Sequence, residues 1–272
     1  RGADIENILN FEQDYPETKI IRLEQNYRST QLILDAATAV VSRNRARKGK
    51  TLWTDRGLGQ RLGLYEAQDA DEEAEFVAGQ IPAQLAEGDE RSIAVLYRTN
   101  AQSRVLEEAL RRCGIAYRVV GGFSFYARAE IKDALAYARL ANNRRDSAAF
   151  LRIVNVPPRG IGGTTLAALE NASRRGRMTL WEALEQEVAA RLLPARALRA
   201  LESFHTLIQE LVADREQLSL SEFFRRLLAR TGYLAMLKAE NLPEAEDRIE
   251  NLQELVNAAA EAEERGETIA EF

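Results

Sequence analysis

Apolar positions along the first 120 residues alternate between two periods. Short apolar runs bounded by polar residues are typical of strands. Four such runs occur, at 19–23, 61–65, 92–97 and 115–120. The stretches between them carry apolar residues at three- and four-residue spacing, which predicts helices. These helices are expected at about 30–41, 71–86 and 101–113. Repeated alternation of strands and helices predicts a mostly parallel sheet with helical crossovers.

Polar residues and glycines mark the expected ends of these helices. Ser29 and Asn100 stand where an N-cap side chain accepts a hydrogen bond from the first helical turn. Gly114 is placed to end the third helix. Acidic residues follow Asp71 in the first turn of the second helix, where the helix dipole favours them, and Pro82 is placed to kink that helix.

From about residue 129 onward the strand pattern disappears and helical spacing takes over. Seven amphipathic segments follow, at about 129–142, 146–154, 163–175, 179–189, 195–214, 219–231 and 244–264. Pro157-Pro158 and Pro194 separate some of them, because proline interrupts helices. The predicted fold class is therefore α/β plus all-α, with a boundary near Gly121-Gly122.

Composition limits the classes of function. The chain has 272 residues, a formal net charge of −5, one histidine and one cysteine. The negative balance argues against a uniformly basic nucleic-acid binder but leaves room for local basic patches. One cysteine excludes an internal disulfide and fits a reducing, cytoplasmic setting. Cys113 is expected to be a small buried residue, and a zinc site is not expected. No apolar run approaches the about 20 residues of a membrane-spanning helix.

The segment Leu23-Glu24-Gln25-Asn26-Tyr27-Arg28-Ser29-Thr30 lies where an expected strand ends and a helix begins. In open α/β sheets, ligands bind at that edge. There Tyr27 could stack on a base and Arg28 could neutralise a phosphate. On spacing alone, a surface loop with a locally packed tyrosine is the more common arrangement.

A glycine-rich turn precedes the helix expected at 163–175. It reads Pro157-Pro158-Arg159-Gly160-Ile161-Gly162-Gly163-Thr164-Thr165. Such a turn exposes backbone N–H groups beside a helix N-terminus, which suits a phosphate. Arg144, Arg145 and Arg152 add positive charge nearby in the sequence. In isolation, a plain helix–turn–helix corner is the more common explanation.

Four collinear segments together resemble the superfamily 1 DNA helicases of the UvrD/Rep/PcrA family. Residues 23–30 resemble the family's motif IV, and Arg1-Gly2-Ala3-Asp4 resembles the tail of its motif III. Residues 96–104 also match, and residues 121–133 resemble the segment that leads into the family's 2B subdomain. The resemblance covers essentially the whole chain.

The resemblance implies a nucleotide-binding role for three residues. Tyr27 is implied to stack on the adenine of ATP, and Arg28 to reach the γ-phosphate like an arginine finger. A fixed guanidinium stabilises the negative charge that gathers on the γ-phosphate oxygens during phosphoryl transfer. Arg1 matches an arginine that couples the nucleotide to the bound strand.

The resemblance also implies contacts with DNA. Arg98 and Asn100 match positions that contact single-stranded DNA, although Asn100 taken alone is equally well explained as a helix N-cap. The glycine-rich turn resembles a helix–hairpin–helix element that grips duplex DNA. On that basis the expected duplex contacts are Lys132, Arg159, Gly160, Ile161, Gly162 and Thr165.

The implied architecture is a partial RecA-like parallel sheet followed by an all-helical domain. Residues 1–24 would be the tail of the first motor domain and a hinge. Residues 25–120 would be the first half of the RecA-like domain 2A, and residues 121–272 a C-terminally truncated DNA-binding domain 2B. The sequence contains no G-x-x-x-x-G-K-[ST] phosphate loop. ATP and Mg²⁺ are therefore implied for a longer protein with Mg²⁺ ligands outside this chain, and the chain alone is not expected to hydrolyse ATP.

The function implied by the resemblance is that of an ATP-dependent 3′-to-5′ DNA helicase or translocase in DNA repair or replication restart. Its partners would be ATP, single-stranded DNA, junctions of single- and double-stranded DNA, and repair or replication proteins, with no membrane. Three alternatives stay open. They are a non-catalytic DNA-binding or autoregulatory module hinged near Gly121-Gly122, part of a helicase–nuclease subunit, and an all-α scaffold without a nucleic-acid role.

Overall fold

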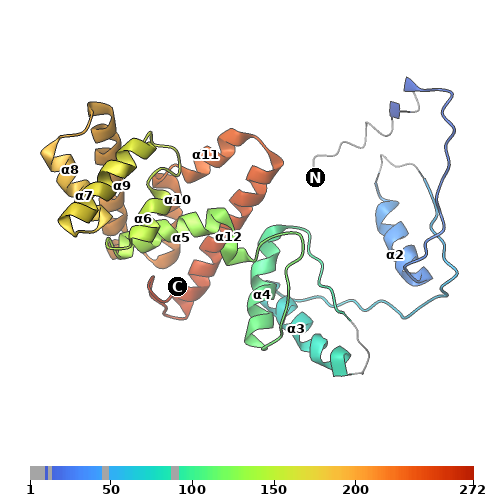
Figure 1. Cartoon of the computed structure of the whole chain (residues 1–272). Helices are drawn as coiled ribbons and strands as arrows, with labels where there is room; N and C mark the ends of the chain where they lie inside the picture. Colours follow the sequence, from blue (N-terminus) through green and yellow to red (C-terminus); the bar gives the residue numbers. More distant parts are fainter. Residues whose placement is uncertain (1–9, 12–13, 45–48, 87–91) are drawn as a thin grey trace. The chain divides into compact units, whose positions relative to one another are not determined.

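The computed structural model describes residues 10–11, 14–44, 49–86 and 92–272 (Figure 1). The chain divides into two compact units, Arg1–Gln68 and Asp69–Phe272. Arg1 and the other residues of the motif III match lie outside the described residues.

The first unit contains helix α2, Gln31–Val41, and a loop at residues 52–58 that lies beside the start of this helix. The N-cap of α2 is Thr30, in an extended conformation, rather than the predicted Ser29. The helix begins one residue later than predicted, because the Thr30 carbonyl accepts the first helical hydrogen bond, from the Leu34 N–H at 3.3 Å. Leu34 is the buried residue of α2.

The second unit begins with a pair of helices. Helix α3 spans Ala70–Ala86, and the short 3₁₀ helix η1, Asn100–Gln102, leads into α4, Ser103–Arg112. Helices α3 and α4 pack together. Their shared cluster consists of Ala74, Ala78, Ile81, Val105, Ala109 and Leu110. Pro82 lies within α3. Cys113, expected to be buried, is exposed just after α4, because it lies beyond the apolar face that α4 turns toward α3.

Helices make up most of the rest of the second unit (Figure 1). They are η2 (Phe125–Ala127), α5 (Ala129–Asn142), α6 (Ser147–Ile153), α7 (Gly163–Gly176), α8 (Leu180–Ala190), α9 (Ala195–Gln217), α10 (Leu220–Arg230), α11 (Tyr233–Glu240) and α12 (Pro243–Glu264). The seven predicted helical segments are confirmed. Helix α11 was missed, because it has only eight residues and follows α10 directly through Gly232, whose φ is +73°.

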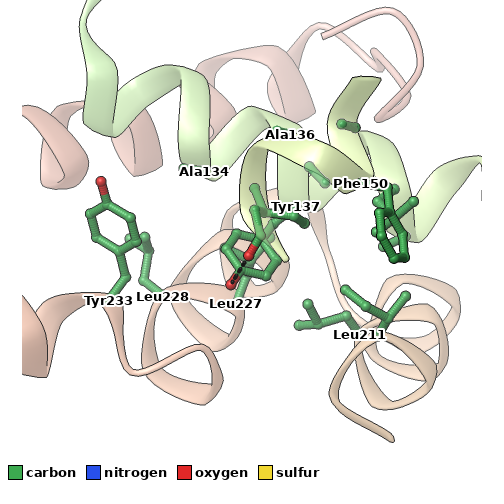
Figure 2. Packing of buried hydrophobic residues seen from close by; sticks show 14 of the residues in the cluster. Ala134, Ala136, Tyr137, Phe150, Leu211, Leu227, Leu228 and Tyr233 are labelled. Carbon is green, nitrogen blue, oxygen red and sulfur yellow. Dashed lines mark hydrogen bonds between the residues drawn. The ribbon is translucent and has the colours of Figure 1, made fainter. Parts of the chain in front are cut away.

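Helix α5 lies at the centre of the helical core. It packs against α6, α9, α10 and α12. Figure 2 shows Tyr137 of α5 close to Leu227 of α10, with Phe150 of α6 and Leu211 of α9 in the same cluster. The hydroxyl of the fully buried Tyr137 donates to the Val156 carbonyl at 2.6 Å. Burying one large apolar side chain of this kind stabilises a fold by about 1.5–3 kcal/mol.

The predicted parallel sheet is not formed in the described parts of the chain. The one pairing of strand type there is an isolated parallel bridge between Gln25 and Trp53. The four predicted strands form neither a helix nor a ladder, and each carries a large exposed apolar residue. These residues are Leu23, Leu64, Leu96 and Val120. A strand is stable only when a neighbour pairs its N–H and C=O groups. The structure is therefore largely helical.

Two buried arginines join α4 and η1 to the helical core. Arg104, only 2% exposed, donates to Glu254 at 2.6 Å and to Glu261 at 2.5 Å, both on α12, and to Glu108 of its own helix. Arg128 donates to the Asn100 carbonyl at 2.8 Å and to Asn251 of α12 at 2.7 Å. Residues 69–120 are therefore one compact unit with the helices that follow. The domain boundary near residue 121 stays a prediction.

Candidate nucleotide and DNA-binding sites

Tyr27 and Arg28 lie on a tight turn that Asn26 builds. The Asn26 side-chain oxygen accepts hydrogen bonds from the backbone N–H of Arg28 at 2.9 Å and of Ser29 at 2.8 Å. This local bond is typical of asparagine, whose short side chain satisfies the backbone of the next residues. The turn presents both side chains immediately before α2.

Both side chains of this turn are open to solvent. Tyr27 is 77% exposed, and its hydroxyl donates to Gln25 at 2.9 Å. Arg28 is exposed, and no hydrogen bond or ion pair with the described residues engages its guanidinium. An exposed aromatic face next to a cation can bind a flat base and an anionic group together. The pair predicted from the sequence is thus brought together at the surface.

The loop at residues 52–58 forms backbone hydrogen bonds with residues of this turn and with the residues that flank it. Asn26 donates its N–H to the Trp53 carbonyl at 2.8 Å, and Trp53 donates its own N–H to Glu24 at 3.1 Å. The N–H of Gln31 donates to the Gly57 carbonyl at 2.9 Å. The Trp53 side chain is 45% exposed; the backbone of Trp53 makes these contacts.

Arg98 lies just before η1, and Asn100 is the first residue of η1. Arg98 is exposed, and the Gln102 side chain accepts the backbone N–H of Arg98 at 2.9 Å and of Thr99 at 3.0 Å. The N-cap of η1 is Thr99, so the alternative that made Asn100 the cap is wrong by one residue. Asn100 is half-buried because its carbonyl accepts from Arg128.

The glycine-rich turn leads directly into α7. Gly160 has a φ of +79°, a conformation that favours glycine. Ile161 is buried and anchors the turn, while Gly162, the N-cap of α7, is exposed. The Asn155 side chain accepts the N–H groups of Arg159 at 2.7 Å and Ile161 at 3.3 Å. The turn is therefore fixed in place with its glycines at the surface.

Three other predicted duplex contacts lie in different environments. Lys132 is exposed on the first turn of α5. Thr165 is only 8% exposed. The guanidinium of Arg159 donates to the carbonyls of Ile153, Pro157 and Thr231 and lies over the rings of Tyr137 and Phe204. Arg159 thus holds the turn against the core from within.

Comparison with known proteins decides the family. The chain matches the UvrD-like helicase C-terminal domain over residues 21–271. The chain belongs to this family.

Curated relatives of this UvrD-like domain are named as helicases. The chain is 44% identical to the ATP-dependent DNA helicase PcrA of Bacillus subtilis over 269 residues, which is 98% of the chain. It is 47% identical to DNA helicase II of Haemophilus influenzae over 262 residues, 96% of the chain, and 45% identical to DNA helicase II of Escherichia coli over 259 residues, 95% of the chain. The chain spans 36% of the length of each of these relatives.

Some residues around the UvrD-like motif IV segment were missed by sequence reasoning. Gln25, Asp55 and Arg56 contact Tyr27 or Arg28 directly or through one another. Asp55 and Arg56 follow the turn by about thirty residues, and neither helical nor strand periodicity relates positions so far apart. The one sequence signal for Asp55 and Arg56 was that polar residues follow Trp53.

Neither a metal cluster nor a membrane span is found in the part of the chain that the structure describes. No group of three or more His, Cys, Asp or Glu side chains there could hold a metal ion. None of the described helices has the length and apolar character needed to cross a bilayer.

Proposed function

We propose that this chain contributes the second-lobe ATP contacts and the DNA contacts of an ATP-dependent 3′-to-5′ DNA helicase in DNA repair or replication restart. The observation that supports this most is the exposed pair Tyr27 and Arg28 on a turn fixed by Asn26. The pair lies in a chain of the UvrD-like helicase family, and its relatives include an ATP-dependent DNA helicase.

The residues at this turn fit a nucleotide. The exposed ring of Tyr27 would lie against the adenine, and the exposed guanidinium of Arg28 would bind the terminal phosphate. Arg1 would add a third contact. ATP, when bound, supplies a phosphoryl bond whose hydrolysis drives movement along DNA. The described residues hold no carboxylate cluster suited to Mg²⁺, so its ligands are proposed to belong to other parts of the helicase.

Stabilising charge is the proposed contribution of Arg28 to hydrolysis. The terminal phosphate oxygens gain negative charge in the transition state, and a guanidinium held at a fixed place stabilises that charge more than water does. Such an arginine typically contributes a factor of about 10³–10⁵ to the rate. Tyr27 contributes affinity and orientation rather than chemistry.

DNA is proposed to bind at two places. Arg98 and Asn100 would contact the backbone of single-stranded DNA. Gly160 and Gly162 of the glycine-rich turn, together with Thr165 in the first turn of α7, would offer backbone N–H groups to a duplex phosphate. Ile161 would hold that turn in place, since its own N–H donates to Asn155, and Lys132 would add a charge. Because the Thr165 side chain is buried, its contact would be made by the main chain. Arg159 would act by holding the turn rather than by touching DNA.

Domain organisation is part of the same proposal. Residues 1–24 would complete the first motor domain, 25–120 would form half of a RecA-like domain 2A, and 121–272 a domain 2B. A partial RecA-like parallel sheet in domain 2A belongs to the same proposal. Partners would be ATP, single-stranded DNA and junctions with duplex DNA, and the setting cytoplasmic.

Replacing Arg28 tests the nucleotide role. In the complete helicase that carries this chain, Arg28→Ala is expected to lower the ATPase kcat by a factor of about 10³ or more. Binding of single-stranded DNA, measured by fluorescence anisotropy, is expected to stay nearly unchanged. Arg61→Ala, an exposed arginine of the same unit, is the matched control and should turn over ATP normally. Normal turnover in Arg28→Ala would contradict the proposal.

A further inference from the structure

Two further side chains, Gln25 and Asp55, form a hydrogen-bond chain that ends at the Tyr27 hydroxyl. The Tyr27 hydroxyl donates to the Gln25 side-chain oxygen at 2.9 Å, and the amide nitrogen of Gln25 donates to Asp55 at 2.7 Å. The nucleotide contacts proposed above use the ring face of Tyr27 and do not involve its hydroxyl. The hydroxyl instead ends a three-residue relay from Asp55 through Gln25 to Tyr27.

The far end of the relay is well fixed. Asp55 lies in the loop at residues 52–58, which backbone hydrogen bonds attach to the Tyr27 turn and to the start of α2. The Gln31 side chain of α2 adds two more contacts to this loop, with the Thr54 N–H at 3.3 Å and the Leu52 carbonyl at 3.5 Å. Asp55 is therefore held by the same short loop whose backbone pairs with Gln25.

Arg56 supports the backbone of the same turn. Its Nη1 atom donates to the Arg28 carbonyl at 2.7 Å and lies 3.5 Å from the Tyr27 carbonyl. One guanidinium therefore engages the carbonyls of both residues that are proposed to bind nucleotide. Through these two carbonyls it restrains the peptide that carries the Arg28 side chain.

We propose that Gln25, Asp55 and Arg56 are positioning residues for the nucleotide. The Asp55–Gln25 relay fixes the ring of Tyr27 in the orientation that a purine stacks on, and Arg56 fixes the backbone that aims Arg28. An exposed tyrosine otherwise samples several rotamers, and binding would have to select one of them. This inference rests on the proposed nucleotide role of Tyr27 and Arg28.

A double-mutant cycle in the complete helicase tests the relay. The variants are Tyr27→Phe, which keeps the ring and removes the hydroxyl, Gln25→Met, and the double variant. The dissociation constant is measured for a non-hydrolysable ATP analogue. Each single change is expected to weaken binding about 3-fold, the worth of one hydrogen bond at a surface site. The double variant should match the singles, because both break the same relay. Effects that multiply, or no effect in either single, would overturn the relay.

Replacement of Arg56 is expected to affect catalysis rather than binding of the ATP analogue. Arg56→Ala should lower the ATPase kcat about 10-fold and leave the dissociation constant of the ATP analogue within about 2-fold, because it acts through Arg28 on the transition state. A merely structural role would instead lower the melting temperature and change both quantities together. Arg61→Ala is again the control. An unchanged kcat in Arg56→Ala overturns this half of the inference.

Tyr27→Ala separates failure of this inference from failure of the proposed function. If Tyr27 binds the nucleotide, this variant should weaken the ATP analogue by about 10-fold or more, since base–aromatic stacking is lost. Unchanged binding in Tyr27→Ala refutes the nucleotide role itself. Weakened binding in Tyr27→Ala, with no change in Tyr27→Phe or Gln25→Met, leaves the nucleotide role standing and refutes only the relay.

Discussion

Three arginines of this chain lie in three different environments. Arg28 is exposed, and its guanidinium has no partner among the residues that the structure describes; Arg159 lies among backbone carbonyls and aromatic rings, and Arg104 is buried among carboxylates. The same type of side chain is a proposed binding group at Arg28, a support for a turn at Arg159 and a link between helices at Arg104. The neighbouring groups decide the role of each arginine, because a buried guanidinium must satisfy its hydrogen-bond donors within the protein.

The ion pairs of Arg104 carry the residue-scale prediction for stability. The pKa of the Arg104 guanidinium lies above its ordinary value: burial alone would lower it, and the hydrogen bonds to Glu261 and Glu254 outweigh that effect. Arg104→Ala would leave Glu254 and Glu261 without their cation. The free energy of unfolding is expected to fall by about 2–4 kcal/mol, measured by chemical denaturation followed by circular dichroism.

Arg112 on the same helix is the matched control. It pairs with Glu75 at 3.1 Å, but both side chains are more than 60% exposed. Exposed ion pairs contribute only about 0–1 kcal/mol, so Arg112→Ala should change the unfolding free energy by less than that. Equal effects of the two substitutions would show that burial does not set the strength of the Arg104 cluster.

Side-chain caps fix the starts of two helices of the second unit. Asp146 caps α6 by accepting the Ala149 N–H at 2.9 Å, and Thr179 with Glu182 caps α8. The apolar stripes predicted seven helical segments in the second half. Helix α11 was missed because Gly232 and its short length hide it beside α10. Local signals therefore predict where most helices of the second unit form, but not the partners they pack against.

Asp146 offers an element-scale prediction with a pH dependence. Burial raises the pKa of this carboxyl, but hydrogen bonds from Ala149 and Arg139 outweigh burial and bring the pKa below its ordinary value. A carboxyl with a lowered folded pKa adds stability above its unfolded pKa and loses it as the pH falls through the folded value. Asp146→Ala should therefore cost about 1 kcal/mol at neutral pH. The difference from the unsubstituted chain should shrink below about pH 4.

Asp146→Ser separates the cap from the ion pair. Serine is also a good N-cap, so this variant should keep most of the stability at neutral pH while losing the 2.6 Å ion pair with Arg139. It should also lose the pH dependence, since serine does not titrate there. A cost for Asp146→Ala that stays constant from neutral to acidic pH would exclude the assigned role of the carboxylate.

At the scale of the whole molecule, long-range pairing marks the limit of what the sequence predicted. The apolar runs at 92–97 and 115–120 predicted strands, yet no partner strand pairs with them among the described residues. Strand formation depends on a neighbouring strand from any part of a protein, and a local apolar pattern does not identify that neighbour. The ion pairs of Arg104 are long-range in the same way, because their partners on α12 lie about 150 residues away in the sequence.

The candidate sites also show that local features were predicted and long-range features were not. Tyr27, Arg28 and the glycine-rich turn were predicted because each is a continuous stretch of sequence with a recognisable family pattern. Their supports, Asp55, Arg56 and Thr231, come from separate stretches and were not predicted. Burial also changed the interpretation of Arg159 and Thr165, since a turn pattern does not show which side chains point inward.

DNA binding is the prediction that belongs to the whole molecule. The chain is acidic overall, with a net charge of −5, so the proposed DNA binding would depend on local cations and on the first turn of α7. Each phosphate contact made by a cation adds about 0.9 to the slope of log affinity against log salt. Lys132→Ala should weaken binding to a junction DNA and reduce this slope by about 0.9.

Lys238 of α11 provides the comparison, because it is also an exposed lysine of the second unit. Lys238→Ala removes the same charge from the protein as a whole. If binding depended only on net charge, both variants would weaken it equally, and the salt slope would change in both. A reduced slope in Lys132→Ala alone, measured by anisotropy across a salt series, requires a phosphate near the start of α5. An unchanged slope in both would place the duplex elsewhere on the helical unit.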